Sequence, residues 1–382
     1  MKRTAAIILA GMLACACIYP YEMTDPEIDG RLVIEGDIVL GGMTEINVRY
    51  LRSLSSYSNA NYGEKPDGLC WIEDNKKQVT ACKYSEPGHY VFDTRSLSRS
   101  RQFRLCYTDS GTGHTYSSPL QSVNYAPKIE KLYYRTNDDD VDILLDLDGG
   151  KNGRYYRWDW TQTWEYTADF APDCYFDTED GSIKQYTMDG SPNYDYYYCW
   201  NEADYEEIGL GQVSSLQNNL TLKAQNVKTI ERDDKKFSSL YRIEVVVRGI
   251  SYGDLQYLQN MKTVSSTSAD LFSPNPSDIV GNISSSDPDE TVIGYINVCT
   301  QNVDTLYISA SDVYVRPYYE RSLFIPETDE KFTIQWFYDQ GYRPTYMDSL
   351  TGICQWSPER CVDCRGYGGT KTKPEGWPTA NE

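Results

Sequence analysis

Hydrophobic and polar residues alternate along the chain in several short stretches, and the longest of these runs from Tyr156 to Tyr166. One parity of this stretch is aromatic except for a single glutamine, and the other parity is charged or carries threonine. Because successive side chains of a strand point to opposite faces, the stretch predicts a long strand with an aromatic inner face. In a β-sandwich such a face usually belongs to the core, and the alternative is a platform for stacking sugar rings. The aromatic face comprises Tyr156, Trp158, Trp160, Gln162, Trp164 and Tyr166.

Shorter strand-like runs lie on both sides of this stretch, separated by Gly, Ser, Asp and Pro. The 34 tyrosines and 8 tryptophans of the chain also favour strands over helices. The pattern therefore predicts a mainly β protein, with an N-terminal immunoglobulin-like β-sandwich over residues 31–127 and a hinge at Pro127. The runs before the hinge cover residues 32–37, 44–51, 70–73, 89–92, 102–107 and 115–123.

The part after Pro127 predicts a second, larger β-rich domain over residues 128–350. Its strand candidates, besides the aromatic stretch, are residues 131–134, 141–147, 239–249, 292–299 and 306–308. Leu255, Leu258 and Met261 recur at helical spacing, so we expect one or two short helices in this domain, one of them over 252–261. Residues 351–382 follow as a C-terminal tail that contains cysteines.

A polar, tyrosine-rich excursion over residues 172–218 interrupts the second domain. Loops on a rigid β scaffold often carry recognition, and tyrosine offers contact area at a small entropy loss. We therefore expect ligand contacts in the excursion, and a locally packed loop is the equal alternative. The candidate ligand-contact residues are Tyr194, Tyr196, Tyr197, Tyr198 and Trp200.

The first 17 residues have the build of a lipoprotein signal peptide, with a basic start, a short apolar run and small residues that end in cysteine. We expect cleavage before Cys17 and lipidation of Cys17, although Cys15 is a second candidate and a soluble secreted protein is the alternative. Residues 18–30 are proline-punctuated and acidic, which suits an extended tether. No later stretch is apolar enough to span a bilayer, so acyl chains would be the anchor.

Export permits disulfides, and nine cysteines follow Cys17. The close pairs Cys70/Cys82 and Cys174/Cys199 look like bridges, although sequence does not fix connectivity. An odd number leaves at least one thiol unpaired within the chain, and Cys106 lies at a strand-like position. The tail could place three thiolates on zinc, but export makes disulfides the better interpretation. The candidate disulfide cysteines are Cys70, Cys82, Cys174, Cys199, Cys354, Cys361 and Cys364.

The net charge and the histidine content disfavour two classes of function, nucleic-acid binding and histidine-dependent catalysis. The formal charge is −20, and loss of Lys2 and Arg3 with the leader brings it near −22, a field that disfavours nucleic acid. The only histidines, His89 and His114, have no catalytic motif beside them, so we expect no enzyme and no cofactor. Asp146 and Asp148 lie in a turn and form a weak calcium candidate, with a solvated acidic turn as the alternative.

Several separate blocks follow one another along the chain. They begin with Cys17-Ile18-Tyr19-Pro20-Tyr21 and Leu32-Val33-Ile34-Glu35-Gly36, continue with Gly88-His89-Tyr90, Tyr155-Tyr156-Arg157-Trp158, Gly281-Asn282-Ile283 and Gly294-Tyr295, and end with Cys361-Val362-Asp363-Cys364-Arg365-Gly366. In this order the blocks resemble a Bacteroidetes family catalogued as domain-of-unknown-function family 4249. The resemblance implies an outer-membrane lipoprotein, often encoded beside a TonB-dependent receptor, with no established activity and no catalytic residue to carry over.

These observations favour a lipid-anchored, cell-surface accessory or binding protein of the outer membrane that partners a TonB-dependent receptor in nutrient uptake. A stand-alone glycan- or nutrient-binding lipoprotein is the alternative. A carboxylate-dependent hydrolase is a third, since a glycosidase pair of carboxylates has no sequence spacing by which to recognise it.

Overall fold

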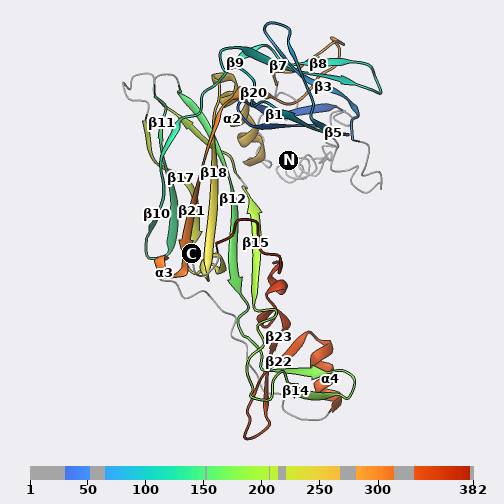
Figure 1. Ribbon diagram of the computed structural model, residues 1–382, viewed down its shortest axis with the longest axis vertical. Helices are drawn as coiled ribbons and strands as arrows, with labels where there is room; N and C mark the ends of the chain where they lie inside the picture. Colours follow the sequence, from blue (N-terminus) through green and yellow to red (C-terminus); the bar gives the residue numbers. More distant parts are fainter. Residues whose placement is uncertain are drawn as a thin grey trace, which may run out of the picture.

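The computed structural model describes residues 31–51, 65–150, 153–205, 207–213, 221–266, 281–313 and 331–378. Strands make up 51% of the structure and helices 11%, which confirms the predicted mainly β class. Two sandwiches and a small lobe follow one another along the long axis of the molecule (Figure 1). The predicted signal peptide, Cys17 and the tether lie outside the described residues.

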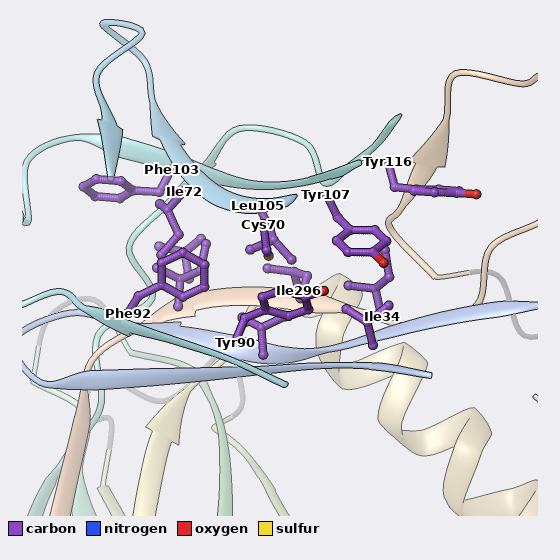
Figure 2. Packing of buried hydrophobic residues seen from close by; sticks show 14 of the residues in the cluster. Ile34, Cys70, Ile72, Tyr90, Phe92, Phe103, Leu105, Tyr107, Tyr116 and Ile296 are labelled. Atoms are coloured by element: carbon purple, nitrogen blue, oxygen red, sulfur yellow. The ribbon is translucent and has the colours of Figure 1, made fainter. Parts of the chain in front are cut away.

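The first sandwich consists of two sheets that pack face to face (Figure 2). One sheet has the order β20-β1-β2-β6-β5, and the other has the order β19-β8-β7-β3-β4 with β9 paired to β7. The first sheet comprises β1 (Leu32–Val39), β2 (Met43–Tyr50), β5 (Tyr84–Glu86), β6 (His89–Asp93) and β20 (Ile296–Cys299). The second comprises β3 (Gly68–Asp74), β4 (Val79–Ala81), β7 (Gln102–Asp109), β8 (Thr115–Ser117), β9 (Gln121–Ser122) and β19 (Ser284–Ser285).

The core of the first sandwich follows from the alternation of its strands. Tyr90 and Phe92 of β6 point across to Phe103 and Tyr107 of β7, and the ring centroids of Tyr90 and Tyr107 are 5.8 Å apart (Figure 2). Ile296 of β20 packs into the same core, since β20 pairs in parallel with β1. The sandwich therefore includes residues from far beyond Pro127. The finer expectation of an immunoglobulin-like strand order stays a prediction.

The second sandwich packs a three-stranded sheet, β10-β11-β17, on a sheet of order β15-β12-β18-β21, with β16 paired to β12. Trp158 and Trp160 of β12 lie in its core, so the aromatic face of the long strand is an inner face as predicted. The strands are β10 (Lys128–Thr136), β11 (Asp140–Asp148), β12 (Tyr155–Thr167), β15 (Tyr198–Asp204), β16 (Gly209–Gln212), β17 (Thr221–Glu231), β18 (Leu240–Gly249) and β21 (Gln301–Ser309).

Helix α2 (Tyr252–Ser266) confirms the predicted helix and lies where the two sandwiches meet (Figure 1). Its start is a capping box, because the Ser251 backbone N–H donates to the Asp254 carboxylate at 2.8 Å and the Asp254 N–H donates to the Ser251 hydroxyl at 3.2 Å. The other helical segments are η2 (Lys235–Phe237), α3 (Ala310–Val313), α4 (Lys331–Asp339), η4 (Glu359–Cys361) and η5 (Cys364–Tyr367).

A small lobe, here called the distal lobe, lies at the end of the molecule away from the first sandwich (Figure 1). It contains two hairpins and a helix: β13 (Cys174–Asp177) with β14 (Ser182–Gln185), β22 (Tyr342–Met347) with β23 (Cys354–Pro358), and α4. Phe176 and Trp356 form its core with the buried Cys174 and Cys354. Part of the tyrosine-rich excursion and part of the C-terminal tail thus fold together.

Candidate ligand site on the distal lobe

A disulfide ties the segment that follows the distal lobe to the second sandwich. It joins Cys199 in β15 to Cys364 at the start of η5, and the two cysteines are 165 positions apart in the sequence. The expected Cys174–Cys199 bridge is therefore wrong. Cys199 packs with Tyr166 and Cys364, whereas Cys174 points into the separate core of the distal lobe.

The other candidate cysteines lie outside this disulfide, and each has different surroundings. Cys70 and Cys82 are not bonded, so that predicted bridge is absent, and the Cys82 thiol donates instead to the Val91 carbonyl at 3.2 Å. Cys361 is buried against Phe170 and Val362. The sulfurs of Cys174 and Cys354 lie 3.4 Å apart in the lobe core.

A pocket of about 310 Å³ opens on the distal lobe, and we call it the distal pocket. Its wall combines tyrosine rings with two arginines, each arginine beside a carboxylate. It is assembled from three separate parts of the chain. The excursion, including β13, supplies one side, and the segment of α4 and β22 together with the C-terminal tail supplies the other. The lining residues are Pro172, Cys174, Tyr175, Phe176, Tyr186, Asn193, Tyr196, Tyr338, Arg343, Pro344, Glu359, Val362, Asp363 and Arg365.

Both arginines of the distal pocket are held in place by stacking and by ion pairs. The Arg365 guanidinium lies 4.2 Å from the centroid of the Tyr196 ring and donates to Asp363 at 2.6 Å. Arg343 lies 4.0 Å from the Tyr338 ring and donates to Glu359 at 2.8 Å. These contacts fix the orientation of both guanidiniums before any ligand arrives.

The carboxylate of Asp363 is stabilised in its charged form. Partial burial alone would raise its pKa, but hydrogen bonds from the Arg365 side chain and backbone N–H, with the Arg365 charge, lower it overall. A negative carboxylate paired with a positive guanidinium suits recognition of a polar ligand.

Of the five predicted ligand-contact residues, only Tyr196 lines the distal pocket. Tyr194 and Tyr198 are exposed, and their rings meet Tyr197 edge to face at 5.3 and 4.9 Å. Tyr197 packs on the cluster around the Cys199–Cys364 disulfide, and Trp200 pairs through its backbone with Thr370. The excursion thus lines the distal pocket at Tyr196 and is a packed segment at Tyr197 and Trp200, and the predicted ligand contact stays a prediction.

The two histidines and the weak calcium candidates have structural partners. His89 faces Asn47 at 3.1 Å, and His114 faces Glu290 at 3.1 Å. Asp146, the calcium candidate, pairs with the Lys223 ammonium at 3.3 Å, and Asp148 accepts from the Gly150 N–H. Among the residues that the structure describes, no three His, Cys, Asp or Glu side chains gather in a way that could hold a metal ion.

A larger cavity of about 590 Å³ lies between the two sandwiches and α2. Asp37 of β1 binds Arg157 of β12 at 2.6 Å, and Arg248 of β18 binds Asp159 of β12. Asp254, the capping residue of α2, has its pKa raised to about 6 by burial. Asp37 of the first sandwich pairs with Arg157 and lies 3.5 Å from Arg248 of the second, so we interpret these groups as the joint between the sandwiches.

The chain belongs to the family described as Domain of unknown function (DUF4249), whose model matches residues 18–305. The match ends before α4, β22 and β23, so one wall of the distal pocket lies beyond it. No curated protein matches the chain. Within the described residues, no helix has both the length and the apolar character needed to cross a membrane.

Proposed function

We propose that this member of the family is a lipid-anchored binding protein of the outer membrane, exposed at the cell surface, whose distal lobe contacts a TonB-dependent transporter during nutrient uptake. The observation that carries the proposal is the distal pocket, a preoriented set of tyrosines and arginines. The distal lobe lies at the end of the molecule away from the first sandwich (Figure 1).

The tether sets the distance of the first sandwich from the membrane. Arg31, the first described residue, follows Cys17 by 14 positions, so a lipid on Cys17 would keep the first sandwich within about 50 Å of the bilayer. The distal lobe, at the other end of the long axis, would then be the part most able to reach a partner.

The surface chemistry of the lobe supports a protein partner. Tyrosine and arginine are enriched at protein interfaces, where large side chains that are already ordered lose little entropy on binding. Tyr194 is 53% exposed and Tyr196 is 46% exposed, and Arg365 is stacked on the Tyr196 ring. This combination favours an accessory subunit that docks through the lobe.

A stand-alone surface binder of glycans or other nutrients is the second candidate. It is favoured by the concave shape of the distal pocket, in which aromatic rings stand beside charged groups that can bind hydroxyls. Titration with neutral oligosaccharides, followed by tyrosine fluorescence, separates a small ligand from a protein partner.

The pocket supports binding better than carboxylate-dependent hydrolysis. A glycosidase needs one carboxyl group whose raised pKa keeps it protonated as the general acid. In the distal pocket Glu359 is paired with Arg343, and the pKa of Asp363 is lowered by the hydrogen bonds from Arg365 that outweigh its burial. Asp363 therefore does not have the environment of a general acid, and Glu359 is held in an ion pair.

The test is an affinity purification of the tagged, lipidated protein from detergent-solubilised outer membranes of its own organism. The distal variant combines Tyr196→Ala with Arg365→Ala. The matched control combines Tyr84→Ala with Arg95→Ala on the first sandwich, where Tyr84 is also exposed and Arg95 also pairs with a nearby aspartate.

The proposal predicts that the wild type and the control recover one TonB-dependent receptor in near-stoichiometric amount and that the distal variant loses it. Recovery of no receptor by the wild type would contradict the accessory role. Equal recovery by all three proteins would contradict docking through the distal pocket.

A further inference from the structure

We propose that Cys174 and Cys354 form a second disulfide, which together with Cys199–Cys364 closes a covalent ring around the distal pocket. The observation behind it is the placement of two buried thiols from different hairpins, with their sulfurs 3.4 Å apart. The ring runs from Cys174 to Cys199, crosses to Cys364, returns along the chain to Cys354, and crosses back to Cys174.

Backbone contacts outside the two cysteines hold them in this position. The Asp173 N–H donates to the Thr345 carbonyl at 3.0 Å, and the Asp173 carboxylate accepts from the Met347 N–H at 2.9 Å. Met347 is paired with Cys354 in the β22–β23 hairpin. The residue before Cys174 is thus bound to the strand opposite Cys354, and a sulfur–sulfur bond of about 2.05 Å requires only a small closing movement.

The covalent ring would contain most of the residues that line the distal pocket. Nine of its fourteen lining residues lie within residues 174–199 or 354–364. Cys174 itself lines the pocket, so the proposed bond would form part of its wall. Closing the ring would restrict the relative movement of the two walls, which is the condition for a preorganised site.

The chemistry of the step is a thiol–disulfide exchange. The two thiols lose two protons and two electrons in forming one sulfur–sulfur bond, and an external disulfide accepts them and is reduced to two thiols. The hydrogen bond with Cys354, together with burial, raises the pKa of Cys174, so the folded thiols would react slowly and the bond would form during folding.

This inference rests on the proposed export only for its source of oxidant. The mature chain, denatured and reduced, is therefore refolded in a buffer of reduced and oxidised glutathione, alkylated without further reduction, and mapped by peptide mass spectrometry. The same map is made from protein purified from membranes. We expect linked peptides that join Cys174 to Cys354, beside those that join Cys199 to Cys364.

Alkylated Cys174 and Cys354 in the refolded protein, or a different partner for either, would overturn the pairing. A bond that forms in glutathione while the membrane-purified protein keeps both thiols would contradict the proposed exported location and leave the pairing standing. The two failures are therefore distinguishable.

The ring itself is tested with the variant Cys174→Ser/Cys354→Ser, whose serines are close in size to the thiols. Hydrogen exchange of the backbone over residues 186–199 is expected to be at least ~10-fold faster than in the wild type, while β12 stays unchanged. Equal exchange in both proteins would overturn the claim that the bond orders the pocket. Faster exchange in β12 as well would indicate general unfolding and would overturn it too.

Discussion

Asp37 is the acidic partner that joins the two sandwiches, and its replacement by asparagine is the sharpest test of how they are held together. It lies on β1 of the first sandwich and is 8% exposed. Its carboxylate binds Arg157 at 2.6 Å and lies 3.5 Å from the Arg248 Nε, and both arginines belong to the second sandwich. The substitution Asp37→Asn keeps the size of the side chain, removes its charge and replaces one of its two acceptor oxygens by an NH2 group, so the hydrogen bond from either Arg157 or Asn297 is lost too.

The expected loss in the free energy of unfolding follows from the burial of the two arginines. The side chains of Arg157 and Arg248 are 20% and 17% exposed, and without Asp37 the carboxylate left to both, among the residues that the structure describes, is Asp159. Two unit charges about 4 Å apart attract by about 4 kcal/mol at an effective dielectric constant near 20. Removing one partner of a buried pair typically costs 3–5 kcal/mol. We expect Asp37→Asn to lower the free energy of unfolding by about 3 kcal/mol.

The assay is urea unfolding at pH 7, followed by tryptophan fluorescence, in a double-mutant cycle. Arg157→Met removes the partner, and Asp37→Asn/Arg157→Met is expected to cost less than the sum of the single losses by about 1–2 kcal/mol. Asp93→Asn, which breaks an exposed ion pair with Arg95, is the control and should leave unfolding unchanged. Single losses that simply add, or a silent Asp37→Asn, would refute the account of the joint.

Three further outcomes follow. Burial raises the folded-state pKa of Asp254 from 3.8 to about 6. Its contribution to the free energy of unfolding is therefore fully present below pH 3.8 and is lost as the pH rises through 6. The loss is at most about 3 kcal/mol. In thermal melts, Asp254→Asn should therefore become more stable relative to the wild type as the pH rises from 4 to 7. A difference in melting temperature that stays constant over this range would contradict a raised pKa of Asp254. Trp158→Ala, in the core of the second sandwich, should cost about 3–5 kcal/mol in urea, and a stable variant would mean that the indole is not core. Cys17→Ser should move the protein from the membrane to the soluble fraction and abolish labelling with a clickable fatty acid, whereas retained labelling would place the lipid elsewhere.

Local patterns predicted the elements well because burial acts on each element separately. The alternation around Trp158 and Trp160 gave a strand with an inner aromatic face, and the spacing of Leu255 and Leu258 gave α2. The order of the strands in the sheets was harder to predict from the sequence, because β20 pairs with β1 although about 260 residues separate them. No local pattern encodes which distant strand completes a sheet.

The candidate site shows the same limit. Tyrosine content pointed to Tyr196, but the arginines stacked beside the pocket tyrosines, Arg343 and Arg365, come from a part of the chain remote in sequence. Cysteine pairing failed for the same reason. Closeness in sequence suggested Cys174 with Cys199, whereas the fold bonds Cys199 to Cys364. A charged residue reveals a site only when its neighbours in space are known.

We propose that the distal lobe contacts a TonB-dependent transporter, and site-specific photocrosslinking in living cells detects such a contact. A photoreactive amino acid replaces Tyr194, two residues before Tyr196 of the distal pocket, in one strain and Tyr84 on the first sandwich in another; these residues are 53% and 57% exposed. The account predicts that position 194 crosslinks to one TonB-dependent receptor, identified by mass spectrometry, and that position 84 does not. No receptor crosslink at position 194, or the same crosslink at both positions, would contradict it.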